Sequence, residues 1–339
     1  MAFEAAEQVT SDASADGLLG PVTREITRLA PSPTGARHLG NARTFLINWA
    51  MARRLGWRVL MRIEDLDTPR VKPGAAEATL EILRWLGLDW DGEVTTQSDD
   101  LSPYQHAMRV LAASGWAYPC ALTRSEIEAA ASAPQEGTAE QRFPPELRPA
   151  TSEAPSVFDA GAEPSNWRLR VPDSAAFEFE DGFAGNQRVD PAESVGDFVI
   201  WTKRGQPSYQ LAVVVDDARQ RVTRVVRGDD LIDSVGRQTL LYRALGLTPR
   251  PGYTHVPLVL GPDGRRLAKR HGDTRLTTYR DRGTPASRIV GLCARWCGIC
   301  PGREPMDAAA FAEAFDLARL PRGPITHTPA DEAWLLEGA

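Results

Sequence analysis

The chain has 339 residues, of which 42% are hydrophobic and 25% are charged, so it can bury a large core, in two domains or in one domain with a large insertion. Its formal net charge of −6 provides no overall attraction to nucleic acid, and any RNA contact must come from local patches. The 4 Cys are too few for a disulfide scaffold, and no apolar run is long enough to span a bilayer.

The first segment, residues 1–22, is acidic and lacks the basic start and apolar core of a signal peptide, so we expect a mobile tail on a cytoplasmic protein. Strand and helix signals then alternate, which predicts a parallel sheet of βαβ units. The predicted elements are a strand over 26–30, a helix over 38–55, a strand over 57–63, a helix from Pro73 to Leu86 ended by Gly87, and a helix to Ser114 that opens with a capping box at Ser102-Pro103-Tyr104-Gln105.

The pattern changes after Tyr118. Residues 131–165 are rich in Ala, Pro, Glu and Ser, and we expect loop or disorder there. Short strands over 167–171, 177–179 and 198–202 indicate a small inserted domain. Alternation resumes with a strand over 222–226, a helix over 231–245 and a strand over 253–260, and helices follow Pro285. We therefore divide the chain into a tail (1–22), a first sheet half (23–118), an inserted domain (119–205), a second sheet half (206–284) and a helical tail (285–339).

Two motifs indicate the chemistry. In the first, from Pro31 to Asn41, a strand turns through Pro and Gly into a helix that begins at His38, and such a helix N-terminus attracts phosphate. Gly40 would let a nucleotide approach the backbone closely. The second is the basic loop Arg266-Leu267-Ala268-Lys269-Arg270, in which Lys269 would supply a mobile charge. Together the motifs predict an enzyme that acts on a nucleoside triphosphate with Mg²⁺.

These motifs resemble those of the class I aminoacyl-tRNA synthetases, and more narrowly the catalytic half of the glutamyl-tRNA synthetases. The family pattern P-S-P-T-G-x-x-H-[ILV]-G is present, whereas in its K-[ILM]-S-K-[RS] loop Arg266 replaces the first Lys and Ala268 replaces Ser. The resemblance spans about residues 27–282 and implies a split Rossmann-type α/β fold with a smaller inserted α/β domain. It also implies ATP activation, weakened but retained, with catalytic roles for His38, Gly40 and Lys269 and with ATP contacts from His38, Gly40, Asn41, Arg266 and Lys269.

A glutamate pocket needs a cation for the side-chain carboxylate and an anion for the α-ammonium group. Arg28 and Arg227 are candidate cations because a guanidinium fork matches a carboxylate, and Glu64 is the candidate anion. The resemblance places the following residues at the family's glutamate-contacting positions: Arg28, Ala30, Ser32, Glu64, Tyr209 and Arg227.

One departure narrows the resemblance to a group of short paralogues. Val213 stands where tRNA-charging relatives carry Asn in a Y-H-L-A-N pattern. Only about 55 residues follow Pro285, too few for an anticodon-binding domain of typical size. The paralogues activate L-glutamate with ATP without tRNA and esterify queuosine at the first anticodon position of tRNA(Asp). We expect this reaction here, in a monomer with no membrane partner.

Two alternatives stay open at this stage. One is a truncated glutamyl-tRNA synthetase that charges the tRNA 3′ end. The other is a non-catalytic RNA-binding paralogue, which the changes at Arg266 and Ala268 would allow. Glutamate-dependent ATP–pyrophosphate exchange would exclude the second.

No metal-binding residue is assigned. The short paralogues often have a zinc site that opens with Cys-x-Cys, but here Cys120 stands alone until Cys293, so we predict that the zinc site is lost. We interpret Cys293, Cys297 and Cys300 as parts of an apolar helix and its end.

Other charged and aromatic residues have simpler structural interpretations. Asp65 and Asp67 could pair with arginines at the surface, the roles of Asp216 and Asp217 stay undecided, and Tyr209 could be a core residue. Candidate RNA contacts, each weak alone, are Arg53, Arg54, Arg142, Arg148, Arg219, Arg221, Arg303 and Arg322, with Trp116, Trp167 and Trp201 as possible stacking residues.

Overall fold

The structure is a computed structural model that describes residues 24–33, 37–67, 71–123, 126–127, 142–150, 157–161, 164–265, 267 and 274–337. The expected tail over 1–22 and the loop residues Arg266 and Lys269 lie outside the described residues. Within the described part, no helix combines the length and apolar character that a membrane crossing requires.

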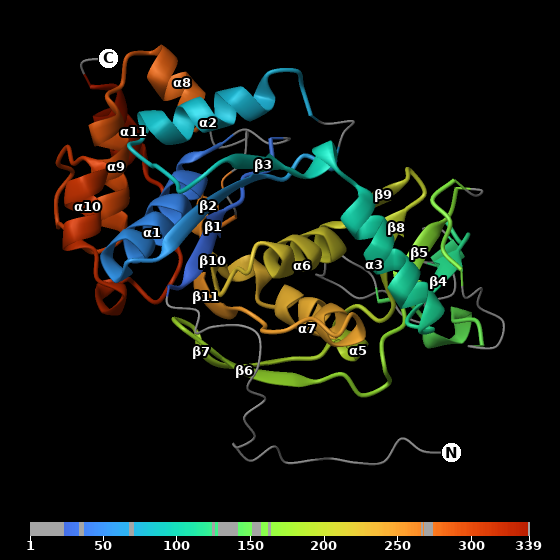
Figure 1. Ribbon diagram of the computed structural model, residues 1–339. Coiled ribbons are helices and arrows are strands. Elements are labelled where there is room, and N and C mark those ends of the chain that lie inside the picture. The colour runs from blue at the N-terminus through green and yellow to red at the C-terminus, as the bar shows by residue number, and fades with distance from the viewer. Residues whose placement is uncertain are drawn as a thin grey trace.

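Parallel strands form the centre of the molecule (Figure 1). β1 (Ile26–Leu29), β2 (Arg58–Ile63) and β3 (Val94–Thr96) pair in parallel, and β10 (Arg224–Gly228) pairs in parallel with β11 (Gly252–Val256). The two groups meet where the backbone N–H of Thr223 donates to the carbonyl of Ile26 at 2.9 Å. The connections contain the helices α1 (Leu39–Leu55), α2 (Ala75–Trp85) and α7 (Ser234–Ala244). The predicted parallel α/β sheet is confirmed.

Helix α1 lies in the middle of the first core. It ends at Leu55 and is capped by Gly56, whose φ of 69° is a left-handed conformation that favours glycine. One face of α1 covers the sheet, and the other packs against C-terminal helices within the same hydrophobic cluster, so the core is closed by the end of the chain. The C-terminal elements are α8 (Leu276–Asp281), α9 (Ala286–Trp296), α10 (Ala308–Ala314), β13 (Ile325–Thr326) and α11 (Pro329–Leu336).

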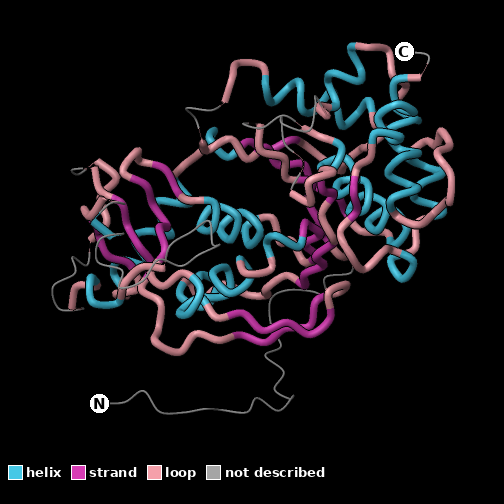
Figure 2. The backbone as a smooth tube through the Cα atoms, turned by 180° about the vertical axis from the view of Figure 1, so that it is seen from behind, coloured by secondary structure: helices cyan, strands magenta, loops and turns pink. Residues whose placement is uncertain are grey.

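The region between the two halves of the parallel sheet is built on antiparallel strands, seen at the side opposite the C-terminal helices (Figures 1 and 2). Its sheet has the order β4 (Ala117–Cys120), β5 (Asn166–Leu169), β8 (Phe198–Thr202) and β9 (Gln206–Pro207). These strands share a second hydrophobic cluster with α3 (Ser102–Ala113), α6 (Tyr209–Arg219) and α7.

A hairpin of β6 (Phe177–Asp181) and β7 (Gly185–Val189) leaves this sheet and returns to the central strands. The backbone N–H of Gly182, in its turn, donates to the carbonyl of Tyr253 on β11 at 2.8 Å. The short helix α5 (Pro191–Ser194) follows the hairpin. The inserted region is therefore attached to the parallel strands at the β6–β7 turn as well as through the chain itself.

Two local predictions need correction. Helix α3 does start at Ser102, but its N-cap residue is Leu101, and no side chain caps it. The backbone N–H of Ser102 instead donates to the side chain of Asp100 at 2.9 Å. The predicted capping box is therefore wrong. The strand predicted over 253–260 is divided into β11 and β12 (Val259–Leu260), because Pro257 lies between them and has no N–H for a ladder.

The segment expected to be loop or disordered, 131–165, is described only in part. Phe143 and Phe158 are buried there, and residues Pro145–Leu147 form one 3₁₀ turn. These described parts are packed against the inserted sheet. The exact domain boundaries remain a prediction.

Candidate active site

The candidate site lies at the carboxyl ends of the parallel strands, where α/β proteins bind ligands. Ala30, Ser32 and the start of the first motif follow β1, and Glu64 follows β2. The backbone N–H of Glu64 donates to the carbonyl of Pro31 at 3.0 Å, which holds the two strand ends together. Arg227 lies near the end of the next strand, β10.

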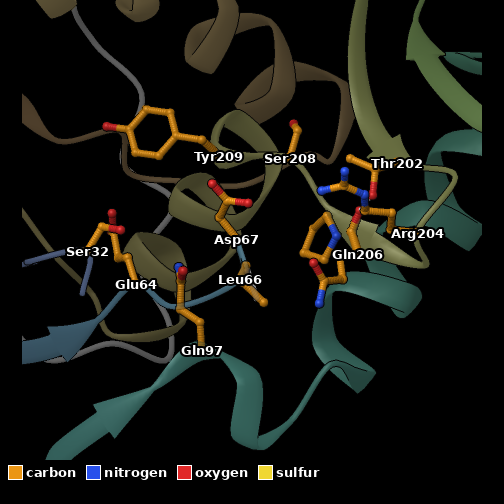
Figure 3. Close-up of a pocket in the computed structure, with 11 residues that line it drawn as sticks. Ser32, Glu64, Leu66, Asp67, Gln97, Thr202, Arg204, Gln206, Ser208 and Tyr209 are labelled. Carbon is orange, nitrogen blue, oxygen red and sulfur yellow. The ribbon is translucent and has the colours of Figure 1, made fainter. Parts of the chain in front are cut away.

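A cavity of about 260 Å³ opens beside these strand ends (Figure 3). Ser32 and Glu64 line one end, and residues of the β8–β9 hairpin, including Arg204 and Gln206, line the other. Tyr209 lies along the cavity and is 41% exposed, so the interpretation of Tyr209 as a core residue is wrong. The remaining lining residues are Leu66, Asp67, Gln97, Thr202, Pro207 and Ser208.

A group of buried charges, which we call the Arg62 cluster, supports the Glu64 end; it comprises Arg28, Arg62, Glu64, Asp216 and Asp217. Arg62 contacts Glu64 at 3.1 Å and Asp217 at 2.8 Å, and Arg28 contacts Asp217 at 3.3 Å. Burial lowers the pKa of Arg62, but the surrounding carboxylates outweigh burial and raise it overall. Burial raises the pKa of Glu64, although Arg62 and Arg28 favour its charged form. Arg28 thus serves the framework as an ion-pair partner of Asp217.

Arg227 has a different environment, which we call the Arg227 cradle. Its Nε donates to His255 Nε2 at 2.9 Å, Nη1 donates to Gln238 Oε1 at 3.1 Å, and Nη2 donates to the carbonyl of Leu231 at 3.1 Å. Arg227 is 6% exposed, yet among the described residues it forms no ion pair. All three acceptors are neutral, so the cradle orients a buried cation without balancing its charge. An anionic ligand would supply that balance.

The chain just after the second motif pairs with the start of the helix that follows the first motif. His38 is the N-cap of α1 and forms a β-bridge with Arg275, just after the basic loop. The N–H of Leu276 donates to the carbonyl of Arg37 at 2.8 Å, and the N–H of Leu39 donates to the carbonyl of Thr274 at 3.3 Å. Residues 274–276 are therefore hydrogen-bonded to the start of α1. The roles of Lys269 and Arg266 stay predictions.

Gly40 and Asn41 have local roles that the sequence did not indicate. A Cβ on Gly40 would lie 3.1 Å from Cε1 and Nδ1 of His38, so glycine makes room for the imidazole against its own helix start. The side chain of Asn41 accepts the backbone N–H of His38 at 3.1 Å. Both residues therefore help to fix His38, and the nucleotide contacts expected of them remain predictions.

The sequence analysis missed Arg37 and did not place Asp67 at the site. Nε and Nη2 of Arg37 are buried and have no hydrogen-bond partner in the part of the chain that the structure describes. Burial lowers the pKa of Arg37 to about 10, although Glu64 acts in the opposite direction. Asp67 is exposed, as expected, and it also lines the cavity, which the sequence analysis did not indicate. Arg37 directly precedes His38 in the first motif, and this position could have indicated a role at the site.

Most of the arginines suggested as RNA contacts are engaged within the protein. Arg53 pairs with Asp89 and Asp91, and Arg148 pairs with Asp197. Four others bind backbone carbonyls or carboxylates: Arg54, Arg142, Arg303 and Arg322. Trp167 and Trp201 are buried around Phe158. These residues therefore support the fold, and the RNA surface is not defined by them.

The cysteines fit the expectation of apolar packing. Cys120, Cys293 and Cys297 are buried, and burial raises the pKa of Cys297 to about 11. Over the described ranges, no three His, Cys, Asp or Glu side chains gather as metal ligands. Loss of the zinc site remains a prediction.

The fold is that of a class I aminoacyl-tRNA synthetase. Residues 25–327 match the catalytic domain of the class I tRNA synthetases for glutamate and glutamine (E and Q), and the chain belongs to this family.

Its relatives define the resemblance more narrowly. The chain is 45% identical over 320 residues to the glutamyl-Q tRNA(Asp) synthetase of Symbiobacterium thermophilum, covering 92% of this chain and 98% of that protein. It is 48% identical over 299 residues to the protein of the same name from Rhodopirellula baltica, covering 86% and 89%. The resemblance to the short paralogues is thus confirmed.

Longer relatives match only in part. The chain covers 61% of glutamate–tRNA ligase 1 of Methylorubrum extorquens, at 41% identity over 88% of this chain. The solved structure of a glutamate tRNA ligase from Elizabethkingia meningosepticum, in complex with its amino acid, superposes with a TM-score of 0.74 at 25% identity; the match covers 92% of this chain and 68% of that one.

Proposed function

We propose that this protein activates L-glutamate with ATP and transfers the glutamyl group to queuosine in tRNA(Asp). The observation that carries the amino-acid part is Arg227, a buried cation with neutral partners only among the described residues. The acceptor part rests on similarity along almost the whole length of relatives named glutamyl-Q tRNA(Asp) synthetase.

In the first step, Arg227 would bind the side-chain carboxylate of glutamate and Glu64 would bind its α-ammonium group. An α-carboxylate oxygen would then attack the α-phosphorus of ATP, forming the acyl–phosphate bond and breaking the bond to pyrophosphate. A carboxylate is already ionised at neutral pH, since its reference pKa is about 4, so this step needs no general base.

Positive charge would lower the barrier of this step. His38 and the N-terminus of α1 are candidate donors, each worth up to about 3–4 kcal/mol when well placed. Arg37 interacts electrostatically with Glu64, so it is a candidate for the α-carboxylate of glutamate, which is next to the ammonium group that Glu64 would bind. It is equally a candidate for the α-phosphate of ATP, which that carboxylate attacks. Lys269 would add a further charge, and ATP would bring Mg²⁺ on its phosphate oxygens.

In the second step, a hydroxyl of the queuosine cyclopentenediol would attack the carbonyl carbon of glutamyl-adenylate, and AMP would leave. The cavity extends from Glu64 to Arg204 on the β8–β9 hairpin, so we propose that the nucleoside enters from the inserted region (Figure 3). We propose that the protein does this as a cytoplasmic monomer, since modified tRNA is found there.

The decisive experiment is ATP–pyrophosphate exchange with each of the twenty amino acids in the absence of tRNA. We expect exchange with glutamate, and a fall of about a hundredfold in Lys269→Ala. Labelled glutamate should then pass to tRNA(Asp) that carries queuosine and not to the same tRNA without it. Transfer to the 3′ end of unmodified tRNA would support the truncated ligase instead, and absence of exchange would support the non-catalytic paralogue.

A further inference from the structure

A buried His–Asp pair lies behind Arg227 and takes no part in the steps above. We propose that Asp181 and His255 are positioning residues that aim the guanidinium of Arg227 and so set the preference for glutamate over glutamine. This inference rests on the proposed function, because it concerns how the same pocket recognises its amino acid.

The hydrogen bonds fix the proton of His255. Its side chain is 0% exposed, Nε2 faces Arg227 Nε at 2.9 Å, and Nδ1 faces Asp181 Oδ2 at 2.6 Å. A guanidinium N–H can only donate, so Nε2 must accept and the ring proton must be on Nδ1. Asp181 accepts that proton's hydrogen bond. His255 is therefore a neutral imidazole in one defined tautomer.

Asp181 is itself held in one orientation by the turn of the β6–β7 hairpin. Its Oδ1 accepts the backbone N–H groups of His255 at 3.0 Å, Phe183 at 3.0 Å and Ala184 at 2.8 Å. Only Oδ2 is left to face the imidazole. The inserted region thus reaches the glutamate pocket through this carboxylate, although Asp181 does not touch Arg227.

The arrangement leaves Arg227 ready for a carboxylate. Arg227 has five N–H groups, and three of them donate to His255, Gln238 and the carbonyl of Leu231. One N–H group is left on each of the two terminal nitrogens. Two unused N–H groups match in number the two oxygens of a carboxylate, each of which accepts a hydrogen bond. The carboxamide of glutamine offers one acceptor and one donor, so it cannot satisfy both N–H groups. A carboxylate in place of His255 would orient Arg227 equally well but would neutralise it.

Asp181→Asn tests this mechanism with little change in shape. The amide oxygen can keep the three backbone N–H groups, so the amide NH₂ faces Nδ1 of His255. Nδ1 must then accept, the ring proton moves to Nε2, and two donors oppose each other at Arg227. We expect the KM for glutamate in the exchange assay to rise about tenfold to a hundredfold, with an unchanged KM for ATP and a reduced preference for glutamate over glutamine.

Nitrogen-15 NMR of labelled histidine reads the tautomer directly, since the chain has only 5 His. The matched control is Asp197→Asn, which alters another buried carboxylate of the inserted region, one that binds Tyr118 and Arg148; both KM values should stay unchanged. An Asp181→Asn variant with the shifted tautomer and a normal KM for glutamate would overturn the proposal. So would a variant with an unshifted tautomer.

A second pair of variants covers the case in which Asp181→Asn does not fold. Gln at position 255 can still offer an oxygen to Arg227, whereas Leu cannot, so His255→Gln should bind glutamate more tightly than His255→Leu. Equal KM values would contradict the inference. If the wild-type protein shows no exchange with glutamate, the proposed function itself fails; if it does and the variants behave alike, only the positioning role fails.

Discussion

The Arg62 cluster and the Arg227 cradle place buried guanidinium groups near the same strand ends, yet they differ in their partners. Arg62 is surrounded by carboxylates, and its charge is used within the protein. Arg227 is surrounded by a ring nitrogen, an amide oxygen and a backbone carbonyl. The difference indicates that ion pairs balance the charge of one buried guanidinium group within the protein, whereas the neutral partners of Arg227 leave its charge unbalanced among the described residues. We propose Arg227 as the ligand-binding cation for this reason.

The largest effect on stability is expected from Arg62→Met. Removing this guanidinium leaves Glu64, Asp216 and part of the contacts of Asp217 without their cation, so the free energy of unfolding should fall by about 3–5 kcal/mol. Chemical denaturation measures this change. Arg53→Met, which removes a partly exposed pair with Asp89 and Asp91, should cost less than about 1 kcal/mol. Equal losses would show that the cluster is not a framework.

Arg227→Met should have the opposite profile. We expect kcat/KM for glutamate in the exchange assay to fall about a hundredfold, since a charge-assisted pair of hydrogen bonds is lost. The unfolding free energy should change by less than in Arg62→Met, because removal of an uncompensated buried charge offsets the loss of three neutral contacts. Arg227→Lys, which retains charge without the fork, is the control and should be intermediate. A stable variant that still prefers glutamate to glutamine would contradict the cradle's role.

Arg37→Met extends the comparison to a third guanidinium group. Since Nε and Nη2 of Arg37 have no hydrogen-bond partner within the described ranges, the melting temperature should stay the same or rise. Exchange activity should fall about tenfold if Arg37 binds the α-carboxylate or the α-phosphate. The exposed Arg250 provides the control variant Arg250→Met. A lower melting temperature with full activity would assign Arg37 to the framework.

The smallest predicted effect is a pH dependence of stability from His255, which faces Asp181, Arg227, Asp229 and the ring of Tyr253. Burial lowers the pKa of His255 below its ordinary 6.5, and Arg227 also lowers it, whereas Asp181 and Asp229 act in the opposite direction. Below pH 6.5, His255 binds a proton in the unfolded chain but stays neutral in the folded protein. The free energy of unfolding therefore falls as the pH falls from 6.5 toward the folded pKa of His255.

The slope cannot exceed about 1.4 kcal/mol per pH unit for one proton. Urea unfolding at several pH values between 7.5 and 5.5, compared with His255→Gln, isolates this contribution. An identical pH dependence in the two proteins would show that His255 is not the neutral group inferred here.

Much of the fold was predictable because local signals agree with the final packing. The strand over 198–202 and the helix after His38 follow clear apolar patterns and have their predicted places as β8 and α1. Helix α6 carried no such signal: Gln210 to Asp217 are all buried, so it has no amphipathic stripe. The interruption at Pro257 was visible in the sequence but overlooked.

The site was predictable only as far as motifs reach. Glu64, Ser32 and Tyr209 do line one cavity. The different environments of Arg28 and Arg227 depend on partners such as Asp217 and His255, which are far away in the sequence. Asp181 and His255 are 74 positions apart, and only the return of the β6–β7 hairpin to β11 brings them together. Neither the composition of the chain nor the spacing of its motifs can predict a contact between residues so far apart in the sequence.

The packing of the C-terminal helices on α1 has a consequence for the modular character of the protein. Gly291 on α9 is so close to the backbone carbonyl of Glu304 that a Cβ there would lie 1.8 Å away, and α9 and α10 share one cluster with α1. These helices are therefore part of the same folded domain as α1 and not a separate C-terminal extension. Cutting the chain near Pro285 should expose the apolar side of α1 to water, so a minimal ATP-binding fragment would have to include them.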